Sequence, residues 1–315
     1  MNNEEPRRLI VAGVCKDIVA ELPKTLKRLE ELQALLPGTQ FVIYENNSVD
    51  GTRDVLRSVS GRPGWHVFSE TVADEVIRKA CIGFSRQDNP CRMEVIAIAR
   101  NRLMEEIEKI VEKGERYHVL MIDLDIWDWE PAQIPELCGK EGWDAISVNS
   151  TDRAGNYRDA SAFRSRRFPL GPEQLGDYWW NKICMKIHRQ HLRRGLVPVL
   201  SAFGGLTIYR WEAIEGLRYA GVVNDEYHKD FLSRRKETRP GFAARFALWK
   251  IGREQKAGTA SKYSKRSDLF GDGSFYLNNS GYDYPVVCEH VPFHAAMRNR
   301  GAGSIFVCTD WKARI

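Results

Sequence analysis

The sequence predicts an α/β fold, in which a mostly parallel β-sheet is flanked by helices. Two observations support this class. Short apolar runs alternate with segments of helical periodicity through the first half of the 315-residue chain. Three of these runs end in polar clusters, at residues 15–17, 45–47 and 123–125. Because ligands of such sheets lie outside the carboxyl ends of the strands, we expect a binding site where the three clusters meet.

Four apolar runs of the first half predict strands, because each is short, aliphatic or aromatic, and bounded by polar residues. They are Leu9–Val14, Phe41–Tyr44, Trp65–Phe68 and Tyr117–Asp125. Between them, aliphatic residues recur at a spacing of three or four and predict helices. These helices cover residues 18–36, a segment that starts at about residue 53, and residues 93–112.

The second half is less regular. Its expected strands lie at residues 144–148, at 197–210, where two short strands surround a glycine pair, and at 285–288. We expect one domain with two halves, residues 1–150 and the irregular residues 151–315. A basic insertion interrupts the second half at about residues 228–275.

Composition and charge narrow the class of protein. The net charge is +5, which suits a polyanionic ligand or an anionic membrane surface without requiring nucleic acid. No stretch approaches the roughly 20 apolar residues of a membrane span, and the first residues lack the order of a signal peptide. Seven scattered cysteines without a C-x-x-C motif predict reduced thiols. We therefore expect a cytoplasmic protein that is associated, at most, with the inner face of the membrane.

The Asp-X-Asp motif at the end of the fourth apolar run is the most informative feature. In a strand, Asp123 and Asp125 would point to the same face. Two neighbouring carboxylates repel each other, and a hard divalent cation relieves this repulsion. Mg²⁺ is usually held by one or two carboxylates together with substrate phosphates. The motif therefore predicts a site for Mg²⁺ or Mn²⁺ and a nucleoside diphosphate, although a single copy also occurs often by chance.

The turn at residues 45–52 admits two interpretations. Asp50 or Thr52 caps the helix that follows, with a glycine between them. The functional interpretation adds Glu45, Asn47 and Asp50 as contacts to the nucleotide.

Arg100 follows Ile96 by four residues on the third predicted helix, so it lies close to the apolar face. An arginine in this position needs a partner. A diphosphate or the carboxylates of the metal site would provide one.

The segment after the last predicted strand gathers titratable side chains. Glu289 is followed by His290, and His294 comes four residues later. Imidazoles together with carboxylates are a plausible ligand set for Mn²⁺. Glu289 is the candidate general base or acceptor-binding residue, and its alternative role is a surface carboxylate paired with an arginine.

Residues 228–266 carry twelve Lys or Arg against three Asp or Glu, with aromatic residues among them. This stretch fits a nucleic-acid surface, a loop over a polyanionic donor, a segment near membrane headgroups, or a solvated insertion.

Taken in order, these motifs resemble a GT-A-fold glycosyltransferase, and more narrowly the fungal capsule-associated α-1,3-mannosyltransferases with their bacterial and viral relatives. The matching pieces extend from Leu9 to about Met297. They include the helix segment Ile98–Leu103, the Asp-Leu-Asp motif and the Phe-Gly-Gly-Leu-Thr segment from Phe203. The sequence departs from the capsule family at Cys288–His290, where a paired-cysteine segment is expected.

The resemblance implies roles for particular residues. Asp123 and Asp125 would be the metal-binding pair, with Asp125 as the main ligand, and His294 would lie near the usual third ligand; the residue pattern adds His290 to this metal set. Glu45 and Asn47 would contact the nucleoside, and Arg100 would face the diphosphate. Gly204 and Gly205 would lie on the acceptor side, and Glu289 would be the acidic residue near the acceptor. Residues 1–150 would thus bind the nucleotide-sugar, and residues 151–315 would bind the acceptor. The expected reaction transfers a sugar from a nucleotide-diphosphate sugar to a glycan or lipid-linked glycan acceptor. A sugar-nucleotide nucleotidyltransferase is a weaker alternative, since it would need a glycine-rich phosphate loop directly after the first strand and the segment Val11–Cys15 holds only one glycine. A non-enzymatic nucleic-acid-binding protein ranks third.

Overall fold

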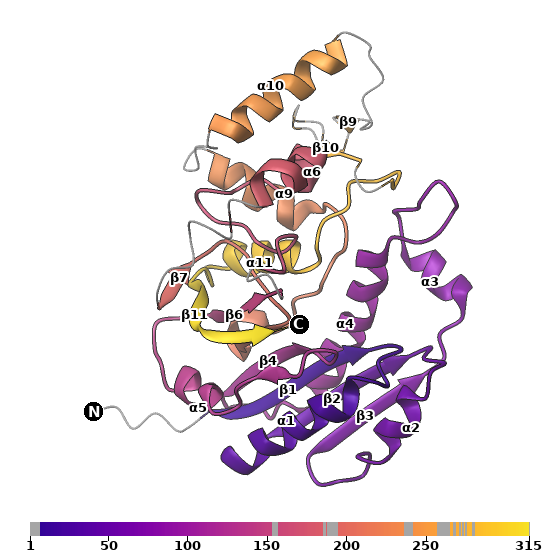
Figure 1. Cartoon of the computed structure of the whole chain (residues 1–315), viewed down its shortest axis with the longest axis vertical. Helices are drawn as coiled ribbons and strands as arrows, with labels where there is room; N and C mark the ends of the chain where they lie inside the picture. Colours follow the sequence, from indigo (N-terminus) through magenta and orange to yellow (C-terminus); the bar gives the residue numbers. More distant parts are fainter. Residues whose placement is uncertain are drawn as a thin grey trace.

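The computed structural model describes residues 7–152, 157–184, 187, 195–235, 242–256, 265–266, 269–270, 272, 274, 276–278 and 281–314. Within these residues, nine strands form one mixed sheet in the order β3-β2-β1-β4-β8-β6-β11-β5, and β7 pairs with β11 (Figure 1). The strands are β1 (Arg8–Cys15), β2 (Gln40–Asn46), β3 (Trp65–Glu70), β4 (Tyr117–Asp123), β5 (Asp128–Trp129), β6 (Ala145–Thr151), β7 (Leu196–Pro198), β8 (Leu206–Arg210) and β11 (Ile305–Arg314). A separate ribbon pairs β9 (Lys265–Arg266) with β10 (Tyr276–Leu277). The predicted α/β class with a mostly parallel sheet is confirmed.

Strands β3, β2, β1 and β4 are parallel, and their register sets the position of the site. Cys15 at the end of β1 lies opposite Glu45 of β2, and Val14 lies opposite Asp123 of β4. The three polar clusters therefore end at the same edge of the sheet, as expected from the sequence.

The two faces of the sheet are covered by two separate cores. Alternate residues of β4 show the division, because Val119 and Met121 belong to one core while Leu120 and Ile122 belong to the other. The second core packs α1 (Leu22–Leu35), α2 (Thr52–Arg57) and α5 (Gln133–Cys138). The first core packs α4 (Arg92–Ile110), α6 (Pro172–Leu175), the π-helix η1 (Trp179–Ile183), α8 (Trp211–Ile214), α9 (Asp225–Arg235), α10 (Phe242–Lys256) and α11 (His290–Asn299). The short α3 (Asp74–Ala80) buries none of its residues.

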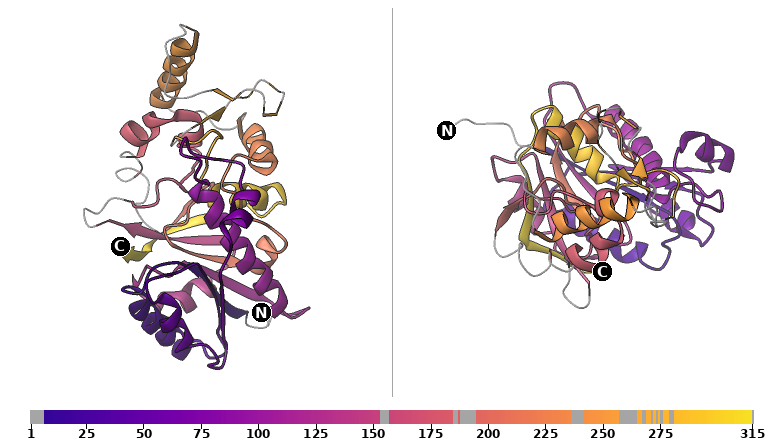
Figure 2. Two further views of the ribbon diagram at one scale, coloured as in Figure 1. Left: turned by 90° about the vertical axis from the view of Figure 1, so that its right-hand side faces the viewer. Right: turned by 90° about the horizontal axis from the view of Figure 1, so that it is seen from above.

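The two halves of the chain build this sheet together. β8 comes from the second half, yet it pairs antiparallel with β4 on one side and β6 on the other. β11 returns from the end of the chain to pair in parallel with β6. In Figures 1 and 2 the strands of the first half lie at one end of the molecule, and α6, α9 and α10 extend away from them at the other.

Helices α9 and α11 are joined by a buried ion cluster. Arg298 of α11 donates two hydrogen bonds of 2.8 Å to Asp230 of α9, and Arg234 donates a third of 2.6 Å. Asp230 is buried, and these arginines lower its pKa although burial alone would raise it. The cluster fixes α11, the helix that begins at the predicted catalytic segment.

Three sequence predictions on secondary structure need correction. β4 ends at Asp123, and Asp125 lies in the turn that follows. The two carboxylates therefore do not share one face of a strand, contrary to the prediction from the sequence. Residues 285–288 form no strand, because Val286 makes only an isolated bridge to Val222. The long strand β11 was not predicted. The expected basic insertion includes most of α9 and all of α10 and β9, while its residues 236–241, 257–264, 267–268, 271, 273 and 275 lie outside the described ranges.

No helix among the described residues is long and apolar enough to cross a membrane. All seven cysteines are free thiols, and five of them are buried.

Candidate active site

A cavity of about 460 Å³ opens at the carboxyl ends of β1, β2 and β4. Its other walls come from α4, from the segment around Asp159, from the Gly204-Gly205 turn, and from the start of α11. The aligned strand ends thus meet residues from the second half of the chain. The pair Asp123 and Asp125, together with Arg100, Glu289 and His290, line this one cavity.

Loops that follow β1 and β2 support one another through hydrogen bonds. The carboxylate of Asp17 accepts a hydrogen bond of 2.7 Å from the Val49 amide, and the Asp17 amide donates to Ser48. Asp17 and Asn47 both adopt positive φ angles, of 53° and 58°, which short polar side chains tolerate best. This pairing holds the two loops in place at the rim of the cavity.

Glu45, near the end of β2, stabilises the turn at residues 45–52 through its side chain. Its buried carboxylate accepts 2.7 Å bonds from the Ser48 amide and from Arg53 Nε. Arg53 also donates to the carbonyl of Glu70, which ties β2 to β3. Both Glu45 oxygens are therefore engaged within the turn, and Glu45 does not line the cavity. The predicted nucleoside contact of Glu45 is replaced by this supporting role.

The other two predicted turn residues differ in position. Asp50 is exposed and accepts hydrogen bonds from Thr52 and from the Val19 amide, which lower its pKa. It organises the start of α2 and does not line the cavity. Asn47 does line it, although its side-chain amide exchanges two 2.8 Å hydrogen bonds with the backbone of Val72.

The acidic pair at the end of β4 lies at the mouth of the cavity. The Ile126 amide donates to the carbonyl of Asp123 and closes a tight turn around Asp125. The pKa of Asp125 is raised, first because the surrounding protein displaces water from its carboxylate and second because Asp123 is negatively charged. Among the described residues, no basic nitrogen lies within ion-pair distance of Asp125. Within the described residues, the pair is therefore neutralised by a direct ion pair only at Asp123, while the more distant charge of Arg158 acts on Asp125.

This donor set fits a hard divalent cation whose remaining ligands come from bound phosphates. Within the described residues, no group of three or more His, Cys, Asp or Glu side chains is arranged to hold a metal without help. Two carboxylates at a cavity mouth are the usual protein contribution to an Mg²⁺ site that shares its ion with substrate phosphates.

The turn at Gly204-Gly205 is placed against this pair. The Asp123 amide donates to the Gly205 carbonyl at 2.8 Å. Both glycines have positive φ angles, and a Cβ on Gly205 would lie 1.9 Å from the Ile126 side chain. Only glycine permits this approach, so the turn can form one wall of the cavity.

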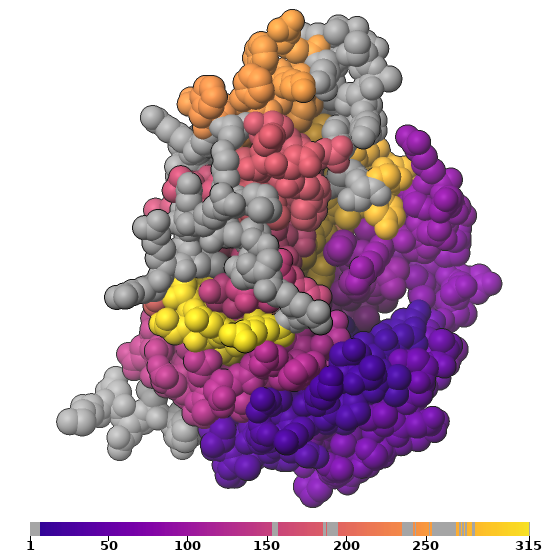
Figure 3. Space-filling model, in the orientation of Figure 1, coloured from indigo at the N-terminus to yellow at the C-terminus, as the bar shows by residue number. Residues whose placement is uncertain are grey.

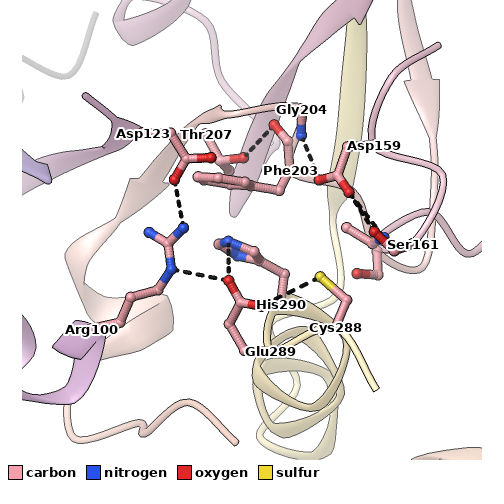
Figure 4. A network of polar contacts seen from close by, with 12 residues as sticks. Arg100, Asp123, Asp159, Ser161, Phe203, Gly204, Thr207, Cys288, Glu289 and His290 are labelled. Carbon is pink, nitrogen blue, oxygen red and sulfur yellow. Dashed lines mark hydrogen bonds and ion pairs between the residues drawn. The ribbon is translucent and has the colours of Figure 1, made fainter. Parts of the chain in front are cut away.

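Arg100 connects the two halves of the site (Figure 4). It is on the buried face of α4, as the sequence predicted, and it is 2 % exposed. Its Nη2 lies 2.7 Å from Asp123 Oδ1, and its Nε lies 3.1 Å from Glu289 Oε1. Burial disfavours the charged guanidinium, but these two carboxylates outweigh it and raise the pKa of Arg100. Its Nη1 has no hydrogen-bond partner among the described residues, so one donor is left for a ligand.

Glu289 is the N-cap residue immediately before α11 and is 4 % exposed. One carboxylate oxygen is paired with Arg100, and the other accepts a weak hydrogen bond from Cys288 Sγ at 3.6 Å. Burial raises the pKa of Glu289, while the charge of Arg100 lowers it in part. A carboxylate with a raised pKa that lines a cavity is suited to accept a proton near neutral pH.

His290 stacks on Phe203 with ring centroids 3.6 Å apart. Burial, followed by the charge of Arg100, lowers its pKa well below the usual value, so the ring is neutral. Its Nε2 lies 3.5 Å from Glu289 Oε1 (Figure 4), but a neutral ring forms no ion pair there. Neither ring nitrogen has a hydrogen-bond partner among the described residues. A buried neutral imidazole without partners, in the wall of a cavity, is available to a ligand.

His294 does not belong to this site. Its Nδ1 lies 2.9 Å from Ser201 Oγ, and its Nε2 lies 3.0 Å from the Tyr209 hydroxyl. The ring is completely buried and does not line the cavity. Because both nitrogens are occupied, the predicted third metal ligand is a core histidine instead.

Asp159 lines the cavity but was missed by the sequence analysis. Its carboxylate accepts hydrogen bonds from the Gly204 amide at 3.1 Å and from Ser161 Oγ at 3.0 Å (Figure 4). Burial raises its pKa, and these hydrogen bonds lower it in part. Asp159 follows a predicted strand in an irregular segment. A polar residue after a strand was therefore the available signal, but no periodicity distinguished it.

Searches of protein-family models and of curated proteins found no match to this chain. Among solved structures, the chain is similar to S. aureus TarS 1–349, with 10% identity over 68% of this chain and 50% of that chain and a TM-score of 0.38. It is also similar to glucosyl-3-phosphoglycerate synthase from Mycobacterium tuberculosis in complex with Mg²⁺ and UDP, with 16% identity over 89% and 91% of the two chains and a TM-score of 0.38. The chain spans half or less of the TarS chains that it matches. Likenesses this distant carry no structural argument, and the resemblance to capsule-associated mannosyltransferases stays a prediction.

Proposed function

We propose that this protein is a metal-dependent glycosyltransferase of GT-A type that uses a nucleotide-diphosphate sugar. The observation that carries the proposal is the cavity in which Asp123 and Asp125 meet Arg100 and Glu289. It combines acidic groups for a cation, a donor for phosphate oxygens and a buried carboxylate for a hydroxyl proton. The resemblance of the sequence motifs supports the same reaction.

The acidic pair would hold Mg²⁺ or Mn²⁺, with Asp125 as the main ligand. Asp123 already neutralises part of the positive charge of Arg100. The cation held by the acidic pair and the guanidinium of Arg100 would therefore each contact the diphosphate. When bound, the cation would supply Lewis-acid stabilisation of the charge on the leaving diphosphate. Arg100 Nη1 would donate to a phosphate oxygen, since guanidinium groups match phosphate geometry.

The transfer requires a proton acceptor if it inverts the anomeric centre. An acceptor hydroxyl attacks the anomeric carbon, and the bond from that carbon to the phosphate oxygen breaks. The bonding electrons leave with the nucleoside diphosphate, and the hydroxyl proton moves to Glu289. The raised pKa of Glu289 favours this role. Asp159, across the cavity, is the second candidate for the same proton.

His290 would contact the sugar or the cation through its free nitrogens. Asn47 would contact the nucleoside from the rim of the cavity. A glycan or lipid-linked glycan remains our proposed acceptor.

Calorimetric titration with UDP, GDP and dTDP, each with and without Mn²⁺, tests the proposal. We expect one nucleotide to bind in a Mn²⁺-dependent manner, and Asp125→Asn to abolish that dependence. Asp128→Asn is the matched control, because Asp128 is three residues away and does not line the cavity. Equal Mn²⁺-dependent binding by both variants would contradict the metal site.

The product identifies the reaction class. A glycosyltransferase releases the nucleoside diphosphate from a sugar nucleotide, whereas a nucleotidyltransferase releases pyrophosphate from a nucleoside triphosphate. Release of pyrophosphate by this protein would overturn the proposal.

A further inference from the structure

Helix α10 presents two faces of different character. Ala244, Ala247 and Ile251 are buried, and their spacing of three and four residues places them on one side of the helix. This side packs into the first core. The helix is therefore anchored to the protein through small aliphatic side chains.

The opposite face of α10 is aromatic and exposed. Phe242 is 78 % exposed, Phe246 is 45 % and Trp249 is 55 %. Their spacing of four and three residues places them in one stripe, and the rings lie 6.5 Å and 5.6 Å apart in sequence order. Solvent-facing sides of helices in water-soluble proteins are normally polar. Three consecutive exposed rings therefore indicate a surface that is covered by a partner.

Basic side chains accompany this stripe. Arg245 and Arg253 are exposed on the same helix, and the guanidinium of Arg253 lies 5.1 Å from the Trp249 ring centroid. The α10 sequence carries four basic residues and one acidic residue, Glu254. The η1 segment, which lies beside α10, adds the exposed Trp180 and Lys182.

Figures 1 and 2 place α10 at the outer end of the molecule, opposite β1–β3, and Figure 3 shows it as a protrusion. A protruding ridge can lie along a flat surface without obstruction from the other described parts of the chain. Aromatic side chains on one face of a helix with basic residues beside them are typical of helices that lie in the membrane interface.

We propose that α10 is a docking helix for an anionic lipid surface. Phe242, Phe246 and Trp249 would enter the headgroup region, and Arg245 and Arg253 would pair with lipid phosphates. A second copy of the chain fits less well, because a symmetric contact would bring the arginines of two copies together. Single-stranded nucleic acid is bound in basic grooves, whereas α10 is a ridge. The proposal is independent of the reaction at the cavity.

Co-sedimentation with vesicles tests it on the full chain. Vesicles of pure phosphatidylcholine are compared with vesicles that contain 30 mol % phosphatidylglycerol, at roughly the physiological ionic strength. The wild type should bind the anionic vesicles at least about tenfold more strongly than the neutral ones. Replacing the three rings by serine, or Arg245 and Arg253 by glutamate, should each reduce this binding by about tenfold or more.

Control variants separate docking from general effects. Val76→Ser and Ile82→Ser alter side chains that are 59 % and 55 % exposed elsewhere on the surface, and they should bind as the wild type does. Trp249→Phe should keep the binding but remove the part of the fluorescence blue shift that Trp249 contributes on entering lipid. Melting temperatures equal to that of the wild type verify that the serine and glutamate variants fold.

Several results would overturn the proposal. One is equal binding of the wild type and the ring variant to anionic vesicles, and another is the absence of any wild-type binding to them. A concentration-dependent dimer in light scattering that is lost in the ring variant would assign the stripe to a second copy. Tight binding of a labelled oligonucleotide that is lost in the same variant would assign it to nucleic acid.

Discussion

His294 provides a quantitative test of the structure, because the sequence and the structure predict different behaviour for it. The ring is completely buried between Ser201 and Tyr209. Burial, followed by the charge of Arg298, lowers its pKa to about 3. We propose the substitution His294→Gln, because glutamine retains hydrogen-bonding groups at the side-chain end but does not titrate.

The magnitude follows from proton linkage. In the unfolded chain a histidine has a pKa of about 6.5. Below that pH the unfolded chain binds a proton that the folded chain does not, so the stability falls as the pH falls, by about 1.4 kcal/mol per unit. The contribution of His294 is thus lost progressively between about pH 6.5 and pH 3. At pH 5 the loss amounts to about 2 kcal/mol relative to pH 7.

Urea unfolding at pH 7, 6 and 5 measures this difference. The variant should be less stable at pH 7, by about 1–3 kcal/mol, because it fits the two partners less well. Between pH 7 and pH 5, however, it should lose about 2 kcal/mol less than the wild type. Its Mn²⁺-dependent nucleotide binding should be unchanged. Parallel pH profiles of the two proteins, or weakened metal binding by the variant, would refute the assignment of His294 to the core.

The remaining predictions concern the cavity. Gly205→Ala should lower the melting temperature and weaken nucleotide binding, because alanine is strained at the φ of +89° that Gly205 adopts and its Cβ would displace the Ile126 side chain; an unchanged melting temperature would show that the turn can relax. Glu289→Gln should keep the nucleotide affinity and reduce the turnover rate by roughly 10²–10⁴, as expected for the loss of a general base. Turnover at the wild-type rate would leave Asp159 as the candidate. His290→Phe should preserve the stack on Phe203 and the stability of the fold while weakening binding of the sugar nucleotide. If it binds the sugar nucleotide as the wild type does, the free nitrogens have no ligand.

Local sequence patterns predicted the parallel half of the fold because its strands are buried on both faces. β1, β2 and β4 are continuous apolar runs, and their ends are marked by polar residues. The last strand, β11, was missed although its burial alternates over Thr309–Arg314. Its place depends on pairing with β6, about 160 residues earlier in the chain, and no local signal reports such a partner.

The segment at 285–288 shows the reverse case. It has the apolar composition of a strand, but among its described contacts only Val286 makes a bridge, to Val222. An apolar run therefore predicts burial more reliably than it predicts sheet pairing. Tertiary partners decide that residues 305–314 become a strand and that residues 285–288 do not.

The same principle explains why the sequence named both histidines of α11 as candidates, although only His290 lines the cavity. His290 and His294 are one turn apart on α11, and both are buried. The spacing treats them alike, since residues four apart share a helix face. Their contacts are made by Ser201, Phe203 and Tyr209, which lie beside α11 only once the chain has folded. Ser201 and Tyr209 satisfy both nitrogens of His294, whereas the Phe203 ring beneath His290 satisfies none. Since buried polar atoms without partners are rare in native proteins, it is this difference, rather than the motif, that favours His290 over His294 as a ligand-binding residue in the proposed site.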